Sequence, residues 1–491
     1  MVQTIDWLAV APVLVLACTA LVVLLADAFA GPPRSRGQAL VPAVLTVAGV
    51  VAAAVPAVQL RGERRLTFCV GETLAGPEAC SFAVDRVTLV FWAVVLFGTA
   101  VVALLGTAAV AEGRTPQGEW NFLLLCSATG ALAIAASRDL VTLVVSLEVV
   151  SLPAFAMVGL RRRDPAAAEA AVKFFLVSVG STAVMLMGVS LLYGATGSVF
   201  LEHIAAALEA GRGPREVAVA GALLTVVGLA FKVAAVPFHM WVPDTYVGAP
   251  VAVAAYLSVV SKAAGFVGLV LVLGHGLAAL ADAWAPVLAV LAALTMTTGN
   301  VLALRQQHAV RLLAWSSVAQ AGYMLVPFGA FASAATALGA SAAYLAVYAF
   351  MNLGAFAVAA VVGTRHPAQR LEDYRGLVRE EPLAGWALAF ALVALAGLPP
   401  GIIGLLAKVM VLTSVAGPVT WLAVVMAVNV AIGLVYYVRW MMLLFRPAEV
   451  PGASTYDVPN GVGVAIGMTF AAGVLLSVFP GLILDPVLAS F

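Results

Sequence analysis

The sequence passes through Gly228-Leu-Ala-Phe-Lys-Val-Ala-Ala-Val-Pro-Phe-His-Met-Trp-Val-Pro-Asp-Thr-Tyr-Val-Gly-Ala-Pro250. This run is apolar enough for a membrane helix, yet it holds Lys232 and His239, and two prolines bracket the histidine. In a bilayer, non-helical backbone and ionisable groups survive only where protein or water surrounds them. We therefore predict a broken helix that lines an ion path, not a continuous helix that faces lipid.

The composition around this run indicates an integral membrane protein. Of its residues, 63% are hydrophobic and 10% are charged, whereas soluble domains carry about 25% charged residues. A net charge of +1 and the absence of a basic cluster interleaved with aromatics give no reason to expect nucleic acid as a partner. The N-terminus lacks the basic region and cleavage site of a secretory signal, so Trp7 to Leu25 is interpreted as a retained first span.

Windows of about 20 apolar residues mark transmembrane helices. They predict an all-α polytopic membrane protein of about 14 transmembrane helices, in which the seventh and twelfth are interrupted by proline. An even number of crossings puts both termini on one side of the membrane. The predicted spans are 7–27, 39–59, 84–110, 120–137, 139–160, 168–194, 217–243, 250–274, 284–304, 310–330, 335–362, 384–413, 419–444 and 461–483.

The two interrupted helices indicate weak internal symmetry. Val-Pro-Phe-His interrupts the seventh helix and Gly-Leu-Pro-Pro-Gly the twelfth, and each break has a lysine nearby, Lys232 and Lys408. Paired interruptions in corresponding positions, an odd number of crossings apart, are typical of an inverted-repeat transporter. We predict one membrane domain over 1–491, with three N-terminal helices in 1–119, a first inverted five-helix repeat in 120–274, a second in 284–444 and a C-terminal helix in 461–483.

The arginines orient the predicted bundle. Loops after odd-numbered helices hold fourteen arginines and loops after even-numbered helices hold seven. The positive-inside rule then puts the first set of loops in the cytoplasm and both termini outside. Cys69 and Cys80 share one loop on the outer, oxidising side, where a disulfide is one possibility that the sequence leaves open.

Lysine is confined to the interior of the predicted helices. The chain has only four, and its other 21 basic residues are arginines in loops or near helix ends. Arginine stays charged, whereas a buried lysine can lose its proton near neutral pH, as a proton relay requires. The alternative is that the long side chains reach interfacial water, which best suits Lys173 near the cytoplasmic start of the sixth helix. The four are Lys173, Lys232, Lys262 and Lys408.

Glu148 is the clearest acidic residue well inside a predicted span. An isolated carboxylate there would cost several kcal/mol, so a partner is expected. We predict Lys173, on the next helix, as that partner, because charges about 6 Å apart at an effective dielectric of about 20 interact by roughly 3 kcal/mol. A static, purely structural ion pair is the alternative.

Two histidines and one polar segment complete the candidates. His239 follows Lys232 by seven residues, two turns of a continued helix, so both side chains are predicted to face one cavity. The alternative for His239 is packing against Trp241 at the end of the broken helix. His308, near the cytoplasmic end of the ninth helix, is either a relay residue or an exposed loop residue. The polar segment 364–382 is either a partner contact or a solvated connection.

Signals of soluble enzymes and redox proteins do not occur in the sequence. It contains no glycine-rich phosphate loop, no HExxH motif and no convincing Ser/His/Asp arrangement. None of the four cysteines has metal-ligand, haem or iron–sulfur spacing. We therefore expect no metal and no cofactor in this chain.

The motif residues resemble a known family. Residues 229–250, followed by Leu257-Ser-Val-Val-Ser-Lys-Ala-Ala264, are similar to the antiporter-like, proton-conducting membrane subunits of NADH:quinone oxidoreductase, respiratory complex I. The wording Pro-Asp-x-Tyr-x-Gly-Ala-Pro looks like the N-subunit branch. Three more blocks are similar and extend the resemblance over most of the chain: the run from Asn300 to Tyr323, Glu-Val-Val-Ser-Leu-Pro on the fifth helix, and Gly397-Leu-Pro-Pro with Lys408.

The resemblance implies a bacterial cell-membrane protein with two inverted five-helix repeats, similar to a cation/proton antiporter. Its partners would be other membrane-arm subunits, including sister antiporter-like subunits. Glu148 and Lys173 would form the coupling pair, Lys232 the relay of the first half, Lys262 the bridge and Lys408 the relay of the second half. NADH, FMN, iron–sulfur clusters and quinone are expected in partner subunits.

Two other functions stay open from the sequence. One is a subunit of a multi-subunit sodium/proton antiporter, which shares this architecture. The other is a purely structural membrane subunit whose lysines only hold helices together.

Overall fold

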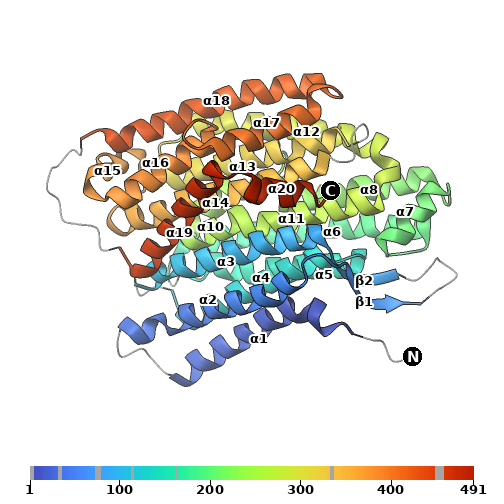
Figure 1. The fold of residues 1–491 in the computed structure, drawn as a ribbon, viewed down its shortest axis with the longest axis horizontal. Coiled ribbons are helices and arrows are strands. Elements are labelled where there is room, and N and C mark those ends of the chain that lie inside the picture. The colour runs from blue at the N-terminus through green and yellow to red at the C-terminus, as the bar shows by residue number, and fades with distance from the viewer. Residues whose placement is uncertain are drawn as a thin grey trace.

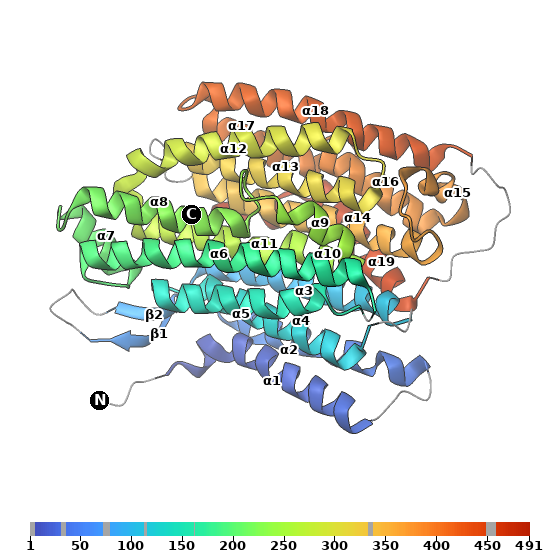
Figure 2. The ribbon, with the colours of Figure 1, turned by 180° about the vertical axis from the view of Figure 1, so that it is seen from behind.

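A computed structural model describes residues 5–30, 36–71, 79–111, 115–161, 163–331, 337–447 and 458–491. Long helices run side by side in one bundle, with a small β-hairpin at one end (Figures 1 and 2). Within the described ranges, eleven helices are long and apolar enough to cross a membrane. The prediction of an all-α polytopic membrane protein is therefore confirmed.

The N-terminal part forms one edge of the bundle and carries a hairpin that was not predicted from the sequence. β1 and β2 pair antiparallel, and a disulfide joins Cys69 to Cys80, which lie opposite each other in the register. The strands were missed because each is only six residues long and lies within a polar connection. The elements are α1 (Trp7–Ala30), α2 (Arg36–Gln59), β1 (Arg65–Val70), β2 (Ala79–Val84) and α3 (Arg86–Ala111).

A buried ion pair fixes the start of α3 to the connection between α4 and α5. Arg138 Nη2 lies 2.6 Å from Asp85 Oδ2, and Thr88 N donates to Asp85 Oδ1 at 3.0 Å. Burial raises the pKa of Asp85, but the Arg138 guanidinium and the hydrogen bonds from Thr88 outweigh it and hold that pKa below its usual value.

The first half of the remaining chain begins with helices that start at sequence-encoded caps. Asp139 Oδ1 accepts from Thr142 N at 2.8 Å at the start of α5, and Asp164 caps α6, whose first residue is Pro165. The elements are α4 (Gln117–Ala136), α5 (Leu140–Val158), α6 (Pro165–Thr196), α7 (Leu201–Glu209), α8 (Arg215–Lys232), α9 (Trp241–Gly248), α10 (Val251–Tyr256), the π-helical η1 (Leu257–Ser261), α11 (Lys262–Leu269) and the π-helical η2 (Val270–Gly276).

The second half repeats this order of crossings, with the fourth one again interrupted. The division at 120–274 and 284–444 stays a prediction, although the matching position of the two breaks agrees with it. The elements are the 3₁₀ turn η3 (Ala278–Leu280), α12 (Ala281–Leu304), α13 (Ala309–Gly329), α14 (Leu338–Arg365), the 3₁₀ turn η5 (Leu371–Tyr374), α15 (Leu377–Glu380), α16 (Pro382–Ala396), α17 (Ile402–Ala416), α18 (Thr420–Phe445), α19 (Asn460–Val478) and α20 (Gly481–Leu488).

The centre of the bundle is formed by α14 and the run from α10 to η2, in which nearly every residue of the apolar stretch is buried. α13 lies beside both, since Lys262 and Tyr348 donate to its Ser317. α13 also packs closely against α12. A Cβ on Gly299 of α12 would lie 2.4 Å from the backbone nitrogen of Ala319 on α13, so only glycine permits this approach. Two α13 residues at this level, Ser316 and Ser317, are fully buried.

Three of the fourteen predicted spans are not among the eleven apolar helices. Two are the interrupted crossings α8/α9 and α16/α17, and the third is α13. α13 is buried along most of its length but carries serine, glutamine and tyrosine side chains inside the protein. The helix that departs from the apolar pattern is therefore the one that brings polar groups to the centre.

Candidate functional site

The first break separates α8 from α9 and leaves residues 233–240 without regular helix. α8 ends at Lys232, and Pro237, which has no backbone N–H, follows a cis peptide bond after Val236. The Val236 backbone N–H is satisfied from another helix, because it donates to Thr295 Oγ1 of α12 at 2.9 Å. Residues 233–235 of the break are buried, whereas Pro237 and Met240 lie at the surface of the chain. The break therefore has one end inside the protein, next to Lys232, and one end open to its surroundings.

Lys232 is buried and contacts three polar side chains from α5 and α6. Its Nζ donates to Ser151 Oγ at 2.8 Å and to Ser178 Oγ at 3.0 Å, and it lies 3.6 Å from Glu148 Oε1. Thr182 Oγ1 donates to the same Glu148 oxygen at 2.8 Å. Glu148 and Ser151 are one turn apart on α5, and Ser178 and Thr182 are one turn apart on α6. Each helix therefore directs one polar stripe at the lysine.

The predicted pairing of Glu148 with Lys173 is wrong in this structure. Lys173 lies at the surface, half exposed, with Glu169 Oε1 at 2.6 Å and Asp244 Oδ2 at 3.5 Å. The α6 residue that contacts Glu148 is Thr182, and nine residues of helix separate it from Lys173, about 13 Å along the axis. Lys173 is accordingly too far towards the helix start, and its surroundings fit the alternative of a side chain that reaches the surface.

His239 lies in the break but does not join the Lys232 cluster. Its ring is buried against Trp315 of α13, with the ring centroids 5.5 Å apart, and its Nδ1 has no hydrogen-bond partner among the described residues. No hydrogen bond links it to Lys232 within the described ranges. The shared cavity predicted for the two is therefore not formed by direct contact. The histidine packs against a tryptophan, as the alternative held, although against Trp315 and not Trp241.

Lys262 is buried at the junction of η1 and α11 and contacts α13. Its Nζ donates to Ser317 O at 2.5 Å and to Ser317 Oγ at 2.7 Å. Tyr348 of α14 also donates to Ser317 Oγ, at 3.0 Å. The lysine has no carboxylate partner within the described part of the chain, so its ammonium group is held by neutral oxygens alone.

α13 continues as a ladder of buried polar side chains from Lys262 towards the second break. Gln320, one turn after Ser316, accepts from Tyr344 at 2.5 Å through its Oε1 and donates to Tyr437 at 3.0 Å through its Nε2. Ser316 is also hydrogen-bonded to Tyr437, and Tyr323 follows within another turn. Sequence analysis missed this ladder, although polar residues at helical spacing in 316–323 were its signal.

Lys408 reaches back from α17 to the end of the preceding half-helix. Its Nζ donates to the carbonyls of Leu395 and Ala396 at 2.7 and 2.8 Å and lies 5.7 Å from the centroid of the Tyr323 ring. The carbonyl end of a helix and the face of an aromatic ring both favour a cation. Gly397 ends α16 with φ of 82°, and a Cβ there would lie 3.0 Å from the Lys408 side chain. The second break is therefore built around the lysine.

A cavity of about 410 Å³ lies away from the hairpin, beside His308. Its wall includes the charged Arg161, the polar Gln369 and the fully buried Tyr246. His308 caps α13 by accepting from Arg311 N at 3.3 Å. Burial lowers the pKa of His308 and so does Arg311, while Asp373 opposes them. The structure thus places His308 at a polar cavity and apart from the buried lysines.

Metal ligation finds no support in the residues that can be described. Among them, no group of three or more histidine, cysteine, aspartate or glutamate side chains could hold a metal ion. The candidate site is therefore the line of three buried lysines, Lys232, Lys262 and Lys408, with their hydroxyl, amide and carbonyl partners.

An interrupted helix in each half and buried lysines at both breaks define the class of polytopic, antiporter-like membrane proteins. The family model described as "NADH:quinone oxidoreductase/Mrp antiporter, TM" matches residues 137–434, more than half of the chain. The chain therefore belongs to this family of membrane subunits, as its motifs suggested.

Individual relatives agree with this family. NADH-quinone oxidoreductase subunit N 2 of Streptomyces griseus is 53% identical over 98% of this chain and 93% of the relative. Subunit N 1 of Sorangium cellulosum is 36% identical over 91% and 90%. A chain of respiratory complex I from Thermus thermophilus superimposes with a TM-score of 0.75 and 28% identity, covering 98% of this chain and 100% of that one. A chain of the Mrp complex from Dietzia sp. shares the fold, with a TM-score of 0.84 at 20% identity over 98% and 97%.

Proposed function

We propose that this chain is a membrane-arm subunit of a proton-pumping NADH:quinone oxidoreductase and carries protons through its buried lysines. The observation that supports this most is the environment of Lys232. Its side chain is buried, lies 3.6 Å from Glu148 and donates to two hydroxyl groups. A buried ammonium with one carboxylate partner is sensitive to any charge change nearby, because little water screens it. Such a group can bind and release a proton in response to a neighbouring event.

The proposed route begins at the Glu148–Lys232 pair. Weakening of the pair favours loss of the Lys232 proton to water beside the break, and a new proton restores the pair. Lys262 lies on the neighbouring α11, which approaches closely because Gly265 has no side chain: a Cβ there would lie 3.0 Å from Lys232 Cβ. Water would carry the proton between the two lysines, since no described side chain bridges them.

From Lys262 the route follows α13. Ser317 accepts from Lys262, and Gln320 with its two tyrosines continues the polar line towards Tyr323, whose ring faces Lys408. Hydroxyl groups both donate and accept, so they can pass a proton along or orient water that does. Lys408, at the carbonyl end of α16, would then hold the proton in the second half until it leaves.

Energy for this movement would come from other subunits. NADH oxidation, FMN, iron–sulfur clusters and quinone reduction are assigned to partners, and this chain supplies no redox group of its own in the proposal. Its partners would be other membrane-arm subunits, including sister antiporter-like subunits, in a bacterial cell membrane. The fourteen-to-seven division of arginines supports an orientation with both termini outside.

A sodium/proton antiporter subunit is the second candidate, favoured only by the shared fold. The likeness to the Dietzia Mrp chain, at 20% identity, shows the fold and not the activity. The relative of 53% identity is a subunit N of an NADH-quinone oxidoreductase, which favours the first candidate.

The two candidates differ in what drives the protons. In liposomes containing the purified complex, addition of NADH and quinone should acidify the side of the membrane that corresponds to the cell exterior. A sodium gradient alone should move no protons. Replacing Lys408 by methionine should lower the protons moved per NADH while NADH oxidation continues. Sodium-driven proton movement without NADH would support the antiporter, and full pumping by the Lys408→Met complex would support a structural subunit.

A further inference from the structure

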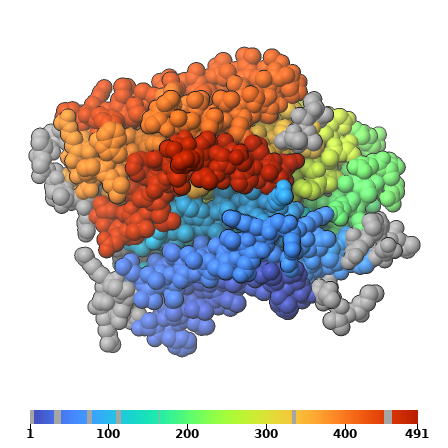
Figure 3. Space-filling model, in the orientation of Figure 1, coloured from blue at the N-terminus to red at the C-terminus, as the bar shows by residue number. Residues whose placement is uncertain are grey.

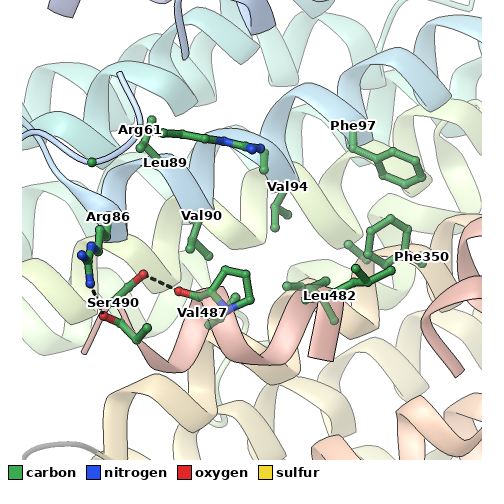
Figure 4. A pocket seen from close by; sticks show the side chains of 17 residues that line it. Arg61, Arg86, Leu89, Val90, Val94, Phe97, Phe350, Leu482, Val487 and Ser490 are labelled. Atoms are coloured by element: carbon green, nitrogen blue, oxygen red, sulfur yellow. Dashed lines mark hydrogen bonds between the residues drawn. The ribbon is translucent and has the colours of Figure 1, made fainter. Parts of the chain in front are cut away.

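A second large cavity lies apart from the lysines, between α3, α14 and α20. Its volume of about 640 Å³ is in the range of ~300–1,000 Å³ typical of ligand sites. Figure 3 shows the face of the molecule on which α20 lies next to α3. Figure 4 shows apolar side chains along the cavity, with two phenylalanines at one end and two arginines towards the other. The apolar lining residues include Val90, Val94, Phe97, Phe350, Leu482 and Val487.

The two arginines carry charge that no described carboxylate neutralises. Arg61 follows α2, and its side chain extends along α3 towards Val94, while Arg86 opens α3 and donates to Ala489 O at 3.2 Å (Figure 4). Neither forms an ion pair with a residue in the described ranges. By contrast, Arg64, close to Arg61 in the sequence, pairs with a carboxylate at 2.8 Å. Arg61 and Arg86 therefore keep donors available for an anion, and the planar guanidinium suits a phosphate.

A smaller groove runs alongside the cavity on α3. It has a volume of about 280 Å³ and runs between α2 and α3, where it is lined by apolar residues of both helices. Its α2 wall consists of Val50, Val51, Ala54, Ala57 and Val58. The groove and the cavity share Arg61, Leu89, Ala93 and Phe97 as lining residues. Two apolar channels thus run side by side along α3, with Arg61 lining both and Arg86 lining the larger one.

We propose that the joined cavities bind one anionic diacyl phospholipid from the leaflet on the hairpin side. Its phosphate would lie between Arg61 and Arg86, one acyl chain would run towards Phe350 and the other would lie between α2 and α3. The occupant is a lipid because a phosphate matches two arginines that have no ion-pair partner in the described ranges, and two acyl chains match the two channels. Basic residues beside apolar pockets between transmembrane helices are the pattern by which proteins hold anionic lipids.

The experiment measures which lipids stay on the purified, assembled complex. The complex is placed in nanodiscs of phosphatidylglycerol and phosphatidylcholine, released into mild detergent, and its retained lipids are counted by native mass spectrometry. Wild type should retain phosphatidylglycerol in preference. Arg61→Gln combined with Arg86→Gln should weaken that retention by about tenfold or more, since each hydrogen bond to a charged group contributes roughly a factor of ten.

A steric variant and a charge control make the result specific. Ala93→Trp places a large side chain in the space of both channels, because Ala93 lines each of them, and leaves both arginines in place. The complex with this variant should no longer retain the lipid. Arg212→Gln removes one arginine from the loop after α7. Because Arg212 lines neither channel, this variant should retain the lipid. Ala93→Trp also serves if the double arginine variant fails to assemble, because its site is open to the cavity.

Three results would overturn the proposal. The first is wild-type retention of phosphatidylglycerol by Ala93→Trp, and the second is equal retention of phosphatidylcholine. The third is a map of the assembled complex in which polypeptide from another subunit fills both channels.

Discussion

Replacing Glu148 by glutamine isolates the electrostatic part of its contact with Lys232. Unit charges 3.6 Å apart attract by about 4–5 kcal/mol at an effective dielectric of ~20, and by about 3 kcal/mol at ~30. The second figure allows for the exposed 27% of the Glu148 side chain. Glutamine has nearly the same shape and can still accept from Thr182. The variant therefore removes the attraction without opening a cavity.

The assay is a double-mutant cycle on NADH-driven acidification of inverted membrane vesicles, expressed per NADH oxidised. Glu148→Gln and Lys232→Met should each reduce pumping, and the double variant should be hardly worse than either. That corresponds to a coupling of about 1 kcal/mol or more, as expected for residues in contact. A matched cycle with Lys173→Met should be additive, because Lys173 pairs with Glu169 at the surface.

The opposite outcome would refute the geometry. If Glu148 and Lys173 couple while Glu148 and Lys232 are additive, then the lysine that responds to Glu148 is the surface residue and not the buried one beside the break. The proposed starting point of the route would then be wrong.

Three further perturbations test separate parts of the structure. Ser317→Ala leaves only the residue's backbone carbonyl to accept from Lys262. It should lower the number of protons pumped per NADH several-fold in the same vesicles, without loss of assembly. Burial raises the pKa of Asp85, but Arg138 holds it below its usual value. The pair therefore stabilises the fold above the unfolded-state pKa of about 4, and this stabilisation is lost as the pH falls through the lowered pKa. Asp85→Asn should lower the thermal stability at neutral pH and reduce its decline in acid, which thermal unfolding measured against pH would show. Reduction of the disulfide between Cys69 and Cys80, 11 residues apart, should destabilise the hairpin by roughly 2–3 kcal/mol, and unchanged hydrogen exchange in the strands after reduction would contradict this.

Much of the fold could be predicted from the sequence because a bilayer imposes simple lengths and polarity. A membrane helix needs about 20 apolar residues, so most spans could be placed within a few residues of their observed ends. The two helix breaks could also be predicted from the sequence. Pro237 lacks a backbone hydrogen-bond donor, and glycine is the residue that most often ends a helix, as Gly397 does here with a positive φ. The hairpin was not predicted, because its short strands depend on pairing across a loop and not on any apolar run.

The burial of most of the lysines was predictable from the sequence, but their contacts were not. The confinement of lysine to apolar helices pointed to four residues, of which Lys232, Lys262 and Lys408 are buried and Lys173 is half exposed. Sequence proximity then suggested Lys173 for Glu148, but the partner is fixed by how α5, α6 and α8 pack, which separation along the chain does not reveal. The α13 ladder was overlooked for the same reason, because serine and tyrosine are common in any helix until their neighbours are known.

The measurement that tests the central claim most directly is the proton-to-electron ratio of the assembled complex carrying Lys232→Ala. Proton movement and NADH oxidation are recorded together in liposomes, with Lys173→Ala as the matched control. The account predicts a sharply reduced ratio for Lys232→Ala, with NADH oxidation retained, and a much smaller effect for the control. A wild-type ratio in the Lys232→Ala complex would contradict the claim that protons pass through this buried lysine.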